Sequence, residues 1–520
     1  MVSAGSGRAS GAGGGAEAPE EVDVLVVGAG LSGVGMASQV RRGLPGRSVA
    51  VLEARESIGG TWDLFRYPGV RSDSDMATLG YAFRPWTGTT ALASGDAIRD
   101  YVRETAREEG VDGLVRHGHR VVAADWSSER ARWTVEVEVA PGEDGARPGG
   151  RRVLTCAVLL VCTGYYRYDR GFTPDLPGVE RYRGRLVHPQ LWPQDLDVTG
   201  QRVVVVGSGA TAITLVPELA RTAEHVVMLQ RSPSYVVSLS SQDALARRLQ
   251  GLPVPPRLAA SLVRARSVLA SSAFYQLSRR APRLTRRLVR RGVERQVPEG
   301  FDVERHFSPR YDPWDQRVAF TRSGDLFSAL RAGTASMVTD SIDTFTETGV
   351  RTASGEHLDA DVVVTATGLE LLLAGGMTVA VDGEEVDLST TVSYKGAMLS
   401  GVPNLVLGLG YTNASWTLKI DLVARFVVRL LRHLDAVGAD AATPVRPDVP
   451  DDALDPLIDL QSGYVLRSVH LLPRQGPRAP WRLHQDYVRD LLLLRRGRVD
   501  DGGLRFSRRR AAPVGAAAAR

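Results

Sequence analysis

Two glycine-rich turns carry the residue types and spacing that most clearly indicate chemistry. The first is Gly28-Ala29-Gly30-Leu31-Ser32-Gly33, and the second is Gly207-Ser208-Gly209-Ala210-Thr211-Ala212. Each follows a short apolar run and precedes a helical pattern, so free backbone N–H groups at a helix N-terminus would meet an anion. Two such turns in one chain predict binding sites for the pyrophosphates of two dinucleotides.

The residue after the second strand of each unit indicates which nucleotide each turn binds. Glu53 has this place in the first unit, where a carboxylate accepts hydrogen bonds from ribose hydroxyls, as FAD or NAD requires. The second unit has Gln230-Arg231-Ser232, with no carboxylate there to repel a 2′-phosphate and with Arg231 available to pair with it. We therefore expect NADPH at the second turn, bound in part by Arg231 and Ser232. The alternative is that Arg231 is only a surface cation.

A block between the two turns makes the interpretation more specific. It runs Tyr182-Arg183-Gly184-Arg185-Leu186-Val187-His188-Pro189-Gln190-Leu191-Trp192-Pro193, and a second motif comprises Gly60, Trp62, Tyr67, Pro68, Gly69 and Asp73. Both resemble the motifs of type I Baeyer–Villiger monooxygenases, with Tyr182 where phenylalanine is usual. Three further runs, at 59–69, 313–317 and 410–419, resemble the ethionamide-activating group within that family. The resemblance extends over about residues 22–514.

This resemblance implies an enzyme that carries FAD and uses NADPH and O2. Reduced flavin would capture oxygen as a C4a-peroxide, which inserts one oxygen beside a ketone carbonyl to give an ester or lactone. Many members also oxidise sulfur compounds such as thioethers and thioamides. Arg317 matches the family's active-site arginine, whose fixed charge would stabilise the peroxide and its adduct. Asp73 matches the acid beside it. The alternatives are an ordinary salt bridge for Arg317 and a loop cap for Asp73.

The resemblance also assigns residues around the cofactors. Those expected to bind FAD are Gly28, Gly30, Ser32, Gly33, Glu53, Thr61, Trp62, Asp63, Leu64, Asp73 and the backbone at Val121. Those expected to bind NADPH are Arg71, Ser72, Gly207, Ser208, Gly209, Ala210, Thr211, Ala212, Arg231 and Ser232. Gly184, His188 and Trp192 would couple domain closure to the active centre, although a structural hinge is the alternative. Trp416 is either a wall of the substrate pocket or a core residue.

Three rival functions share some of these features. The first is a flavin monooxygenase that oxygenates nitrogen or sulfur but not ketones, and Trp192-Pro193 with Arg317 favours ketone chemistry over it. The second is a two-nucleotide disulfide reductase, which needs a thiol pair near the flavin, whereas no cysteine precedes Cys156. The third is a non-catalytic redox sensor, which would not be bleached by NADPH and recoloured by air.

The elements that must position these residues follow an α/β pattern. Strands are predicted at 22–27, 49–52, 202–206 and 226–229, with helices at 32–42 and from the second turn to Leu219. We expect two Rossmann-like domains, one for FAD and one for NADP, with a helical insertion. The FAD domain would comprise 21–164 and 369–520, the NADP domain 165–236 and 318–368, and the insertion 237–317, after a disordered tail at 1–20. Strands ending at Gly164 and Gly368 would mark crossings between domains.

The insertion has unusual surface chemistry. Residues 243–296 are predicted to be helical and arginine-rich, with an apolar face formed by Leu284, Leu288, Val289 and Val293. The simpler interpretation is a solvated helical subdomain. The alternative is weak peripheral contact with an anionic membrane surface that delivers lipophilic substrates.

The composition excludes several classes of protein. The formal net charge is +5 and the positive charge is almost all arginine, dispersed along the chain, which argues against a dedicated nucleic-acid binder. The nine histidines show no metal-ligand spacing, so no metal site is expected. Cys156 and Cys162 lie in an apolar run and resemble neither a metal site nor a redox pair. With no signal-peptide pattern at the start, these features favour a cytoplasmic enzyme that acts on small ketones or sulfur compounds.

Overall fold

The computed structural model describes residues 19–142, 147 and 149–509. The predicted N-terminal tail lies outside these residues except for Pro19 and Glu20, and Glu20 is the first residue of β1 (Glu20–Val27) rather than part of a tail. Its backbone is already paired with Leu154 of β6 (Gly150–Val161). The arginine- and alanine-rich end beyond residue 509 is also outside the described residues.

The larger sheet contains the first glycine turn. β1 lies between β2 (Val49–Leu52) and β6, parallel to both, so the carboxyl ends of all three strands meet at one edge. Late segments join the same sheet, since β21 (Leu405–Leu407) pairs with β6 and β17 (Thr378–Val381) pairs with β4 (His119–Ser127). The remaining strands are β3 (Val115–Arg116), β5 (Arg132–Val139) and β18 (Glu384–Glu385).

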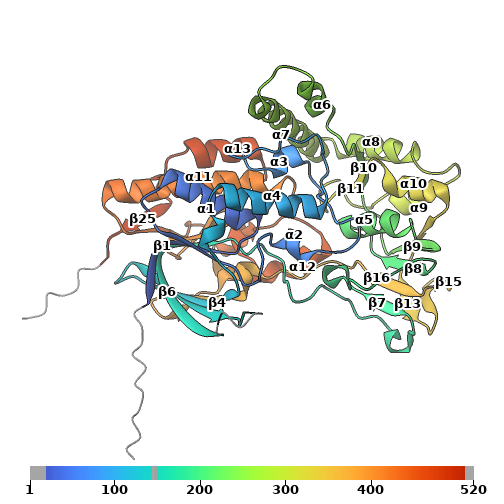
Figure 1. The fold of residues 1–520 in the computed structure, drawn as a ribbon, viewed down its shortest axis with the longest axis horizontal. Helices are drawn as coiled ribbons and strands as arrows, with labels where there is room; N and C mark the ends of the chain where they lie inside the picture. The colour runs from blue at the N-terminus through green and yellow to red at the C-terminus, as the bar shows by residue number, and fades with distance from the viewer. Residues whose placement is uncertain (1–18, 143–146, 148, 510–520) are drawn as a thin grey trace, which may run out of the picture.

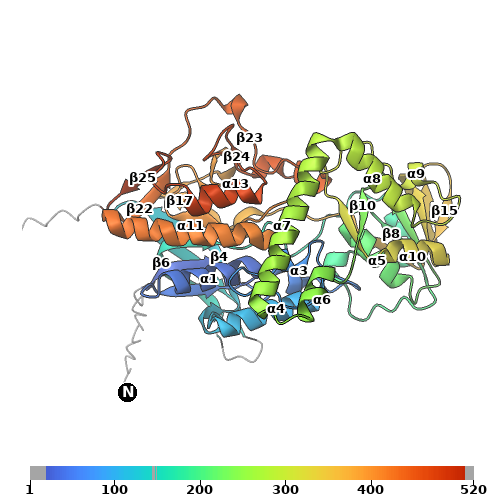
Figure 2. The same ribbon diagram turned by 90° about the horizontal axis from the view of Figure 1, so that it is seen from above.

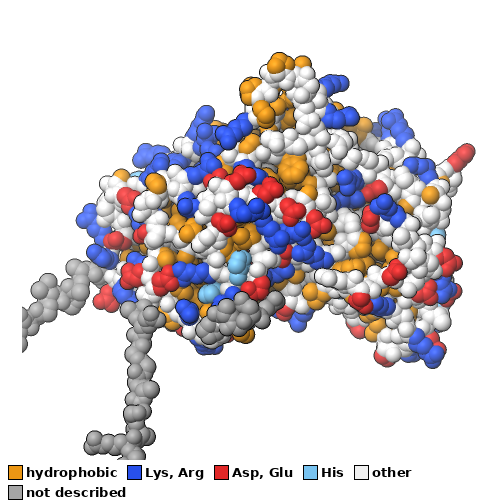
Figure 3. All heavy atoms as spheres, viewed as in Figure 1, with side chains coloured by type: hydrophobic (Ala, Val, Ile, Leu, Met, Phe, Trp, Pro, Cys, Tyr) orange, Lys and Arg blue, Asp and Glu red, His pale blue; other side chains and the backbone are white. Residues whose placement is uncertain are grey.

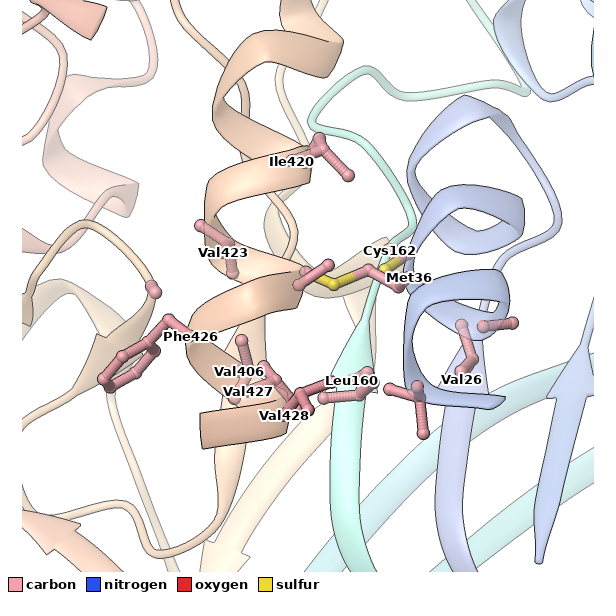
Figure 4. Close-up of a cluster of buried hydrophobic side chains, with 14 of the residues drawn as sticks. Val26, Met36, Leu160, Cys162, Val406, Ile420, Val423, Phe426, Val427 and Val428 are labelled. Atoms are coloured by element: carbon pink, nitrogen blue, oxygen red, sulfur yellow. The ribbon is translucent and has the colours of Figure 1, made fainter. Parts of the chain in front are cut away.

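Two helices distant in sequence cover this sheet together. α1 (Leu31–Gly43) follows the first turn, and α11 (Trp416–Val437) packs beside it over β6. Figure 4 shows the apolar side chains between them, among them Met36, Cys162 and Val423. The helices approach so closely at Gly43 that a Cβ there would lie 2.5 Å from a methyl carbon of Val428. This core fixes the start of α1 against the carboxyl end of β6.

The second sheet is wholly parallel and contains the second glycine turn. Its order is β12 (Ala335–Thr339), β9 (His225–Gln230), β8 (Arg202–Val206), β16 (Val362–Thr365) and β7 (Arg185–Val187). The edge strand β7 comes from the block at 182–193. Both faces are covered, because Val203 and Val205 pack with α5 (Ala210–Leu219) and α10 (Asp325–Ala332) whereas Val204 packs against the other side. The predicted α/β class with two Rossmann-like units is confirmed.

The helical insertion lies between two paired strands, β10 (Val236–Leu239) and β11 (Ala319–Arg322). It comprises α6 (Ala244–Gln250), α7 (Pro256–Arg280), α8 (Pro282–Glu294) and α9 (Val303–Phe307). The long α7 crosses the molecule above α3 (Met76–Leu79), as Figure 2 shows. No helix in the described part of the chain has both the length and the apolar character needed to cross a bilayer.

One prediction for the insertion is wrong. Leu284 and Leu288 are exposed, but Val293 is buried and Val289 is half-buried, so the four residues do not share a face. At 100° per residue, Val289 and Val293 lie on the side of α8 opposite to the leucines. The apolar residues of α8 are therefore divided between the core and the surface.

Shorter elements connect and cover these units. The chain crosses from the larger to the second sheet after β6 and returns after β16 (Figure 1), and Gly164 and Gly368 have φ values of 70° and 107° at these points. The C-terminal segment returns to the first unit, where β25 (Leu504–Ser507) pairs with β22 (Ala441–Pro444). The remaining elements include α2 (Thr61–Leu64), α4 (Gly95–Glu108), α12 (Gly463–Leu466), α13 (Tyr487–Leu491), β13 (Ile342–Phe345), β14 (Gly349–Thr352), β15 (His357–Asp359), β19 (Ser393–Tyr394), β20 (Met398–Leu399), β23 (Asp455–Pro456) and β24 (Arg474–Gln475).

Candidate functional site

One cavity of about 1280 Å³ connects the two glycine turns. This volume exceeds the usual range for a site that holds one small ligand. The carboxyl ends of the parallel strands of both sheets open onto it. The sequence-predicted residues that line it are Gly28, Gly30, Ser32, Glu53, Thr61, Trp62, Arg71, Ser72, Asp73, Val121, Gly207, Ser208, Gly209, Ala210, Thr211, Arg231, Ser232, Arg317 and Trp416.

A charged pair lies between the two turns. A guanidinium nitrogen of Arg317 is 2.7 Å from Oδ2 of Asp73, and each side chain keeps one third of its surface exposed. Both residues line the cavity. The negative charge of Asp73 raises the pKa of Arg317 further above its usual value, so the guanidinium stays charged at every working pH. The structure thus presents a fixed cation to the cavity, oriented by a carboxylate.

Aromatic side chains form the wall near this pair, and most were missed by the sequence analysis. Tyr165 stacks on Trp416 with ring centroids 5.1 Å apart, and Tyr166 lies against both Tyr165 and Tyr464. The three tyrosines are close enough to Arg317 to affect its pKa. The hydroxyl of Tyr464 is buried and has no hydrogen-bond partner within the described protein. Tyr165 and Tyr166 are neighbours after the first crossing, whereas Tyr464 comes from α12 far along the chain, so no sequence spacing indicated that they meet.

Trp416 connects this wall to the first glycine turn. Its indole Nε1 donates a hydrogen bond to Oγ of Ser32 at 2.7 Å, and the ring leaves no room for a Cβ at Gly410. Trp416 is half-buried, and its ring is shared between the cavity wall and the apolar core. The two alternatives for Trp416, pocket wall and core residue, therefore describe two sides of one ring.

The first turn is held tightly by backbone contacts. Gly28 has a φ of 100°, and a Cβ there would lie 2.7 Å from the carbonyl oxygen of Cys162. Oε2 of Glu53 accepts a hydrogen bond from the N–H of Ala29 at 2.7 Å, and burial raises the pKa of Glu53. Gly33 does not line the cavity, because it packs α1 against the turn, where a Cβ would overlap the carbonyl oxygen of Gly28. Gly33 thus supports the fold of the site rather than its surface.

The second turn is more open. Gly207 has a φ of 143°, and a Cβ there would approach the carbonyl oxygen of Ala366 to 2.3 Å, whereas a Cβ at Gly209 would meet nothing within 4 Å. Gly209 is the N-cap residue of α5 and provides no side-chain cap, so the helix N-terminus faces the cavity uncapped. Ala212 is buried in the core under α5 and does not line the cavity.

The sequence analysis also missed a carboxylate near Arg231. Asp340 follows β12, its N–H donates to the carbonyl oxygen of Gln230, and it lines the cavity as Arg231 does. Hydrogen bonding from Ser354 lowers the pKa of Asp340 to about 2, so it is ionised at neutral pH. The sequence predicted no carboxylate here because none follows the second strand of this unit. Asp340 instead follows β12, more than 100 residues later in the chain.

Two residues expected at the FAD site lie outside the cavity. Asp63 is buried and forms ion pairs with three arginines, at 2.8 Å to Arg55, 2.9 Å to Arg66 and 2.8 Å to Arg103. Its carboxylate therefore joins the turn after β2 to α2 and α4. Leu64 is half-buried next to it and does not line the cavity either. α2 presents Thr61 and Trp62 to the cavity and its other side to the protein, and the assignment of Asp63 and Leu64 to FAD stays a prediction.

Arg71 and Ser72 reach the cavity but have protein partners. Arg71 forms an ion pair with Asp325 at the start of α10, with its second guanidinium nitrogen 3.3 Å from Oδ1. Oγ of Ser72 donates to the carbonyl oxygen of Ser74 at 2.6 Å. Through Asp325, Arg71 links the segment that carries Asp73 to the second unit.

The 182–193 block connects the second sheet to the crossing at Gly368. Nδ1 of His188 accepts from the N–H of Gln190 at 3.2 Å, so Nε2 carries the proton and donates to the carbonyl oxygen of Gly368 at 3.1 Å. Burial lowers the pKa of His188, which favours this neutral tautomer. Gly184 has no room for a Cβ because the carbonyl oxygen of Asp361 would be 2.6 Å away. Trp192 packs on the second unit's core, so none of the three motif residues lines the cavity.

The thiols and histidines do not suggest further chemistry. Cys156 and Cys162 are free and buried, and burial raises the pKa of both thiols. Among the described residues, no three His, Cys, Asp or Glu side chains gather in a way that would bind a metal ion.

The chain is similar to known protein families and to named proteins. The model of the flavin-binding monooxygenase-like family matches residues 94–441, and that of an NAD(P)-binding Rossmann-like domain matches residues 26–88. The chain is 50% identical to the FAD-containing monooxygenase EthA of Mycobacterium tuberculosis over 497 residues, which cover 95% of this chain and 99% of that protein.

Solved structures share the fold. A steroid monooxygenase bound to NADP aligns with a TM-score of 0.72 at 23% identity, covering 94% of this chain and 100% of that chain. A cyclohexanone monooxygenase bound to ε-caprolactone aligns with a TM-score of 0.70 at 18% identity, with the same coverage. With the family model matching more than half of its length and a relative at 50% identity over nearly all of it, the chain belongs to the flavin-binding monooxygenase-like family.

Proposed function

We propose that this protein is an FAD-containing, NADPH- and O2-dependent Baeyer–Villiger monooxygenase that converts ketones into esters or lactones. We propose that it also oxidises sulfur compounds such as thioethers and thioamides. The observation that carries the proposal is the Arg317–Asp73 pair, which faces a cavity lined by both glycine turns. The 50% identity to a protein named as FAD-containing supports the choice of flavin.

Two helix N-termini support the binding of two dinucleotides. α1 and α5 both begin at a glycine without a side-chain cap, and both glycines line the cavity. FAD would be bound by the first turn with Ser32, Glu53, Thr61 and Trp62, and NADPH by the second turn with Arg231 and Ser232. In this proposal the FAD domain comprises 21–164 and 369–520, and the NADP domain comprises 165–236 and 318–368.

The bound cofactors supply a hydride from NADPH and an oxygen activated on the reduced flavin. The protein's part is to stabilise negative charge on oxygen as it attacks the carbonyl carbon. Arg317 would donate N–H groups and present a permanent positive charge to that oxygen. Asp73 holds the guanidinium in place through the 2.7 Å contact. Tyr165, Tyr166 and Tyr464 would form the aromatic wall beside the reacting atoms.

The remaining motif residues act at a distance from the reacting atoms. His188 joins β7 to Gly368, which lies on the second crossing between the two units. A change in the angle between the units would be transmitted along this contact, so His188, Gly184 and Trp192 are positioning residues for closure. Trp416, bonded to Ser32, would form the substrate side of the flavin pocket.

The test is product analysis with the purified holoenzyme. Linear, cyclic and aryl ketones, thioethers and thioamides are each incubated with NADPH and air, and the products are identified by mass spectrometry. Esters or lactones that carry one atom from labelled O2 are expected. Sulfoxides without any ester would instead support the rival function, an N- or S-oxygenating flavin monooxygenase.

A further inference from the structure

The outward face of α7 carries a row of exposed apolar residues. Leu258, Leu262, Leu269 and Leu277 are 53%, 48%, 64% and 37% exposed, and Ala265 and Ala273 are exposed between them. These positions recur every three or four residues, so they form one stripe about 28 Å long at 1.5 Å per residue. The buried side of α7, with Ala260 and Val263, packs on the protein. A surface helix is normally polar on its outer face, so the stripe needs a covering partner.

The stripe continues onto neighbouring elements. Leu252 in the turn before α7 is 55% exposed, and Leu284 and Leu288 of α8 are 47% and 50% exposed. Leu252 also lines a hollow of about 300 Å³ between α6, α7 and the 86–91 loop. α6 and α7 rise above the rest of the molecule in Figure 1, and Figure 3 shows hydrophobic side chains gathered on this projection. The apolar surface is therefore convex and accessible.

The charged residues within the segment that carries the stripe all have one sign. Residues 244–293 contain twelve arginines, no lysine and no aspartate or glutamate. Five of these arginines are paired with acids from elsewhere in the chain. In the described part of the chain, the others form no ion pair, and they are Arg247, Arg248, Arg257, Arg280, Arg283, Arg287 and Arg291. These side chains are all exposed and flank the leucines along α6, α7 and α8.

We infer that α6, α7 and the exposed side of α8 form a docking surface for an anionic lipid bilayer. Exposed leucines enter the boundary between headgroups and acyl chains, while the surrounding arginines meet lipid phosphates. Face-to-face pairing of two copies would instead bring the unpaired arginines together, which disfavours a second copy as the partner. The contact is peripheral, and it would supply lipophilic substrates to the proposed monooxygenase. The surface itself follows from the exposed residues and is independent of the reaction.

The experiment is co-sedimentation of the holoenzyme with vesicles. Vesicles of phosphatidylcholine with 30 mol% phosphatidylglycerol are compared with pure phosphatidylcholine, at ~50 mM and ~500 mM NaCl, where screening differs strongly. We expect binding to the anionic vesicles that weakens at high salt, and at least about tenfold weaker partitioning to the neutral ones. Equal binding to both vesicle types, or no binding to either, would overturn the inference.

Matched variants locate the surface. Leu262→Ser with Leu269→Ser, and separately Arg283→Gln with Arg287→Gln, should each lower the partition coefficient by about tenfold. Two control variants change exposed residues of the same kinds on β6, namely Val153→Ser and, separately, Arg151→Gln with Arg152→Gln. Each should leave the partition coefficient within about twofold of the parental value. FAD content and turnover of a water-soluble substrate verify folding. Unchanged partitioning in both the leucine and the arginine variants would contradict the inference. It would also be contradicted if the protein formed an oligomer through Leu269 and did not bind vesicles.

Discussion

At the scale of single residues, the choice of arginine at position 317 explains the electrostatics of the site. A lysine tends to lose its proton where it is desolvated, whereas a guanidinium remains charged. Asp73 raises the pKa of Arg317 further and leaves a third of the side chain open to the cavity. The contacts of His188 depend on its protonation state, because only the neutral ring can accept one hydrogen bond and donate another.

We predict that His188 makes the protein less stable in mild acid. Burial lowers its pKa in the folded state below the ordinary 6.5, so the unfolded chain takes up the proton first as the pH falls. Stability should thus be complete above about pH 6.5 and decrease as the pH falls from there toward the folded-state pKa. Thermal unfolding at pH 7.5 and 5.5 should show a smaller decrease in Tm for His188→Asn than for the parent.

Other half-buried histidines contribute to the dependence of Tm on pH, so His188→Asn should reduce this dependence without abolishing it. Burial also lowers the pKa of His119, His306 and His484. The control is His470→Asn, which changes an exposed histidine and should keep the parental slope. An identical slope for His188→Asn would show that this ring does not titrate with folding.

At the scale of elements, the two glycine turns differ in what a side chain would meet. Gly28 is enclosed by the backbone of Cys162 and has a positive φ, so substitution there strains the fold. Gly209 has open space and an ordinary φ of −80°. A side chain at Gly209 would thus occupy the space proposed for the NADPH pyrophosphate without disturbing the protein.

Gly209→Val should therefore raise the KM for NADPH by about tenfold or more, the cost of losing roughly 1.4 kcal/mol of binding. The FAD content and Tm should remain those of the parent. Gly113→Val, at another glycine with open space around it, is the matched control and should change neither KM nor Tm. If Gly209→Val kept the parental KM while FAD was lost, the assignment of the two turns would have to be reversed.

At this scale, the strands that carry the glycine turns could be predicted from the sequence, whereas contacts between distant segments could not. The bounds of β2 and β8 match the prediction because their apolar runs end sharply, at Glu53 and Gly207. Tyr166 and Tyr464 meet across about 300 residues of chain, and Asp340 reaches Gln230 from another strand, so local patterns carried no sign of them. The apolar residues of α8 are close together in sequence, but the leucines and the valines lie on opposite sides of the helix, so they do not form the predicted single face. The exposed apolar stripe of α7 could not be predicted from the sequence, because the sequence does not show which side of the helix packs on the protein.

At the scale of the whole molecule, the chain's only two lysines fasten its last segment to the first unit. Nζ of Lys419 on α11 is 2.7 Å from Oδ2 of Asp490, which also accepts from the hydroxyl of Tyr411 at 2.8 Å. Nζ of Lys395 is 2.8 Å from Asp501. Tyr411 lines the cavity, so this buried network connects the C-terminal segment to the wall of the site.

Breaking the Lys419–Asp490 pair on one side should strongly destabilise the protein. Both side chains are 1% exposed, and burial already lowers the pKa of Lys419. Asp490→Asn leaves the ammonium without a counter-charge and should cost about 3–5 kcal/mol. The double variant Lys419→Met with Asp490→Leu removes both charges and should be more stable than Asp490→Asn in guanidinium denaturation. A double variant as unstable as the sum of its single variants would contradict this account.

The central claim is that the charge of Arg317 stabilises negative oxygen at the reacting centre. The most direct measurement compares ester formation, NADPH consumption and H2O2 release in the parent, Arg317→Lys and Arg317→Ala, each loaded with FAD. The account predicts that Arg317→Ala forms ester about 10²–10³-fold more slowly while NADPH is still consumed and H2O2 is released instead. Arg317→Lys should fall between the two. Ester formation at the parental rate in Arg317→Ala would contradict the account.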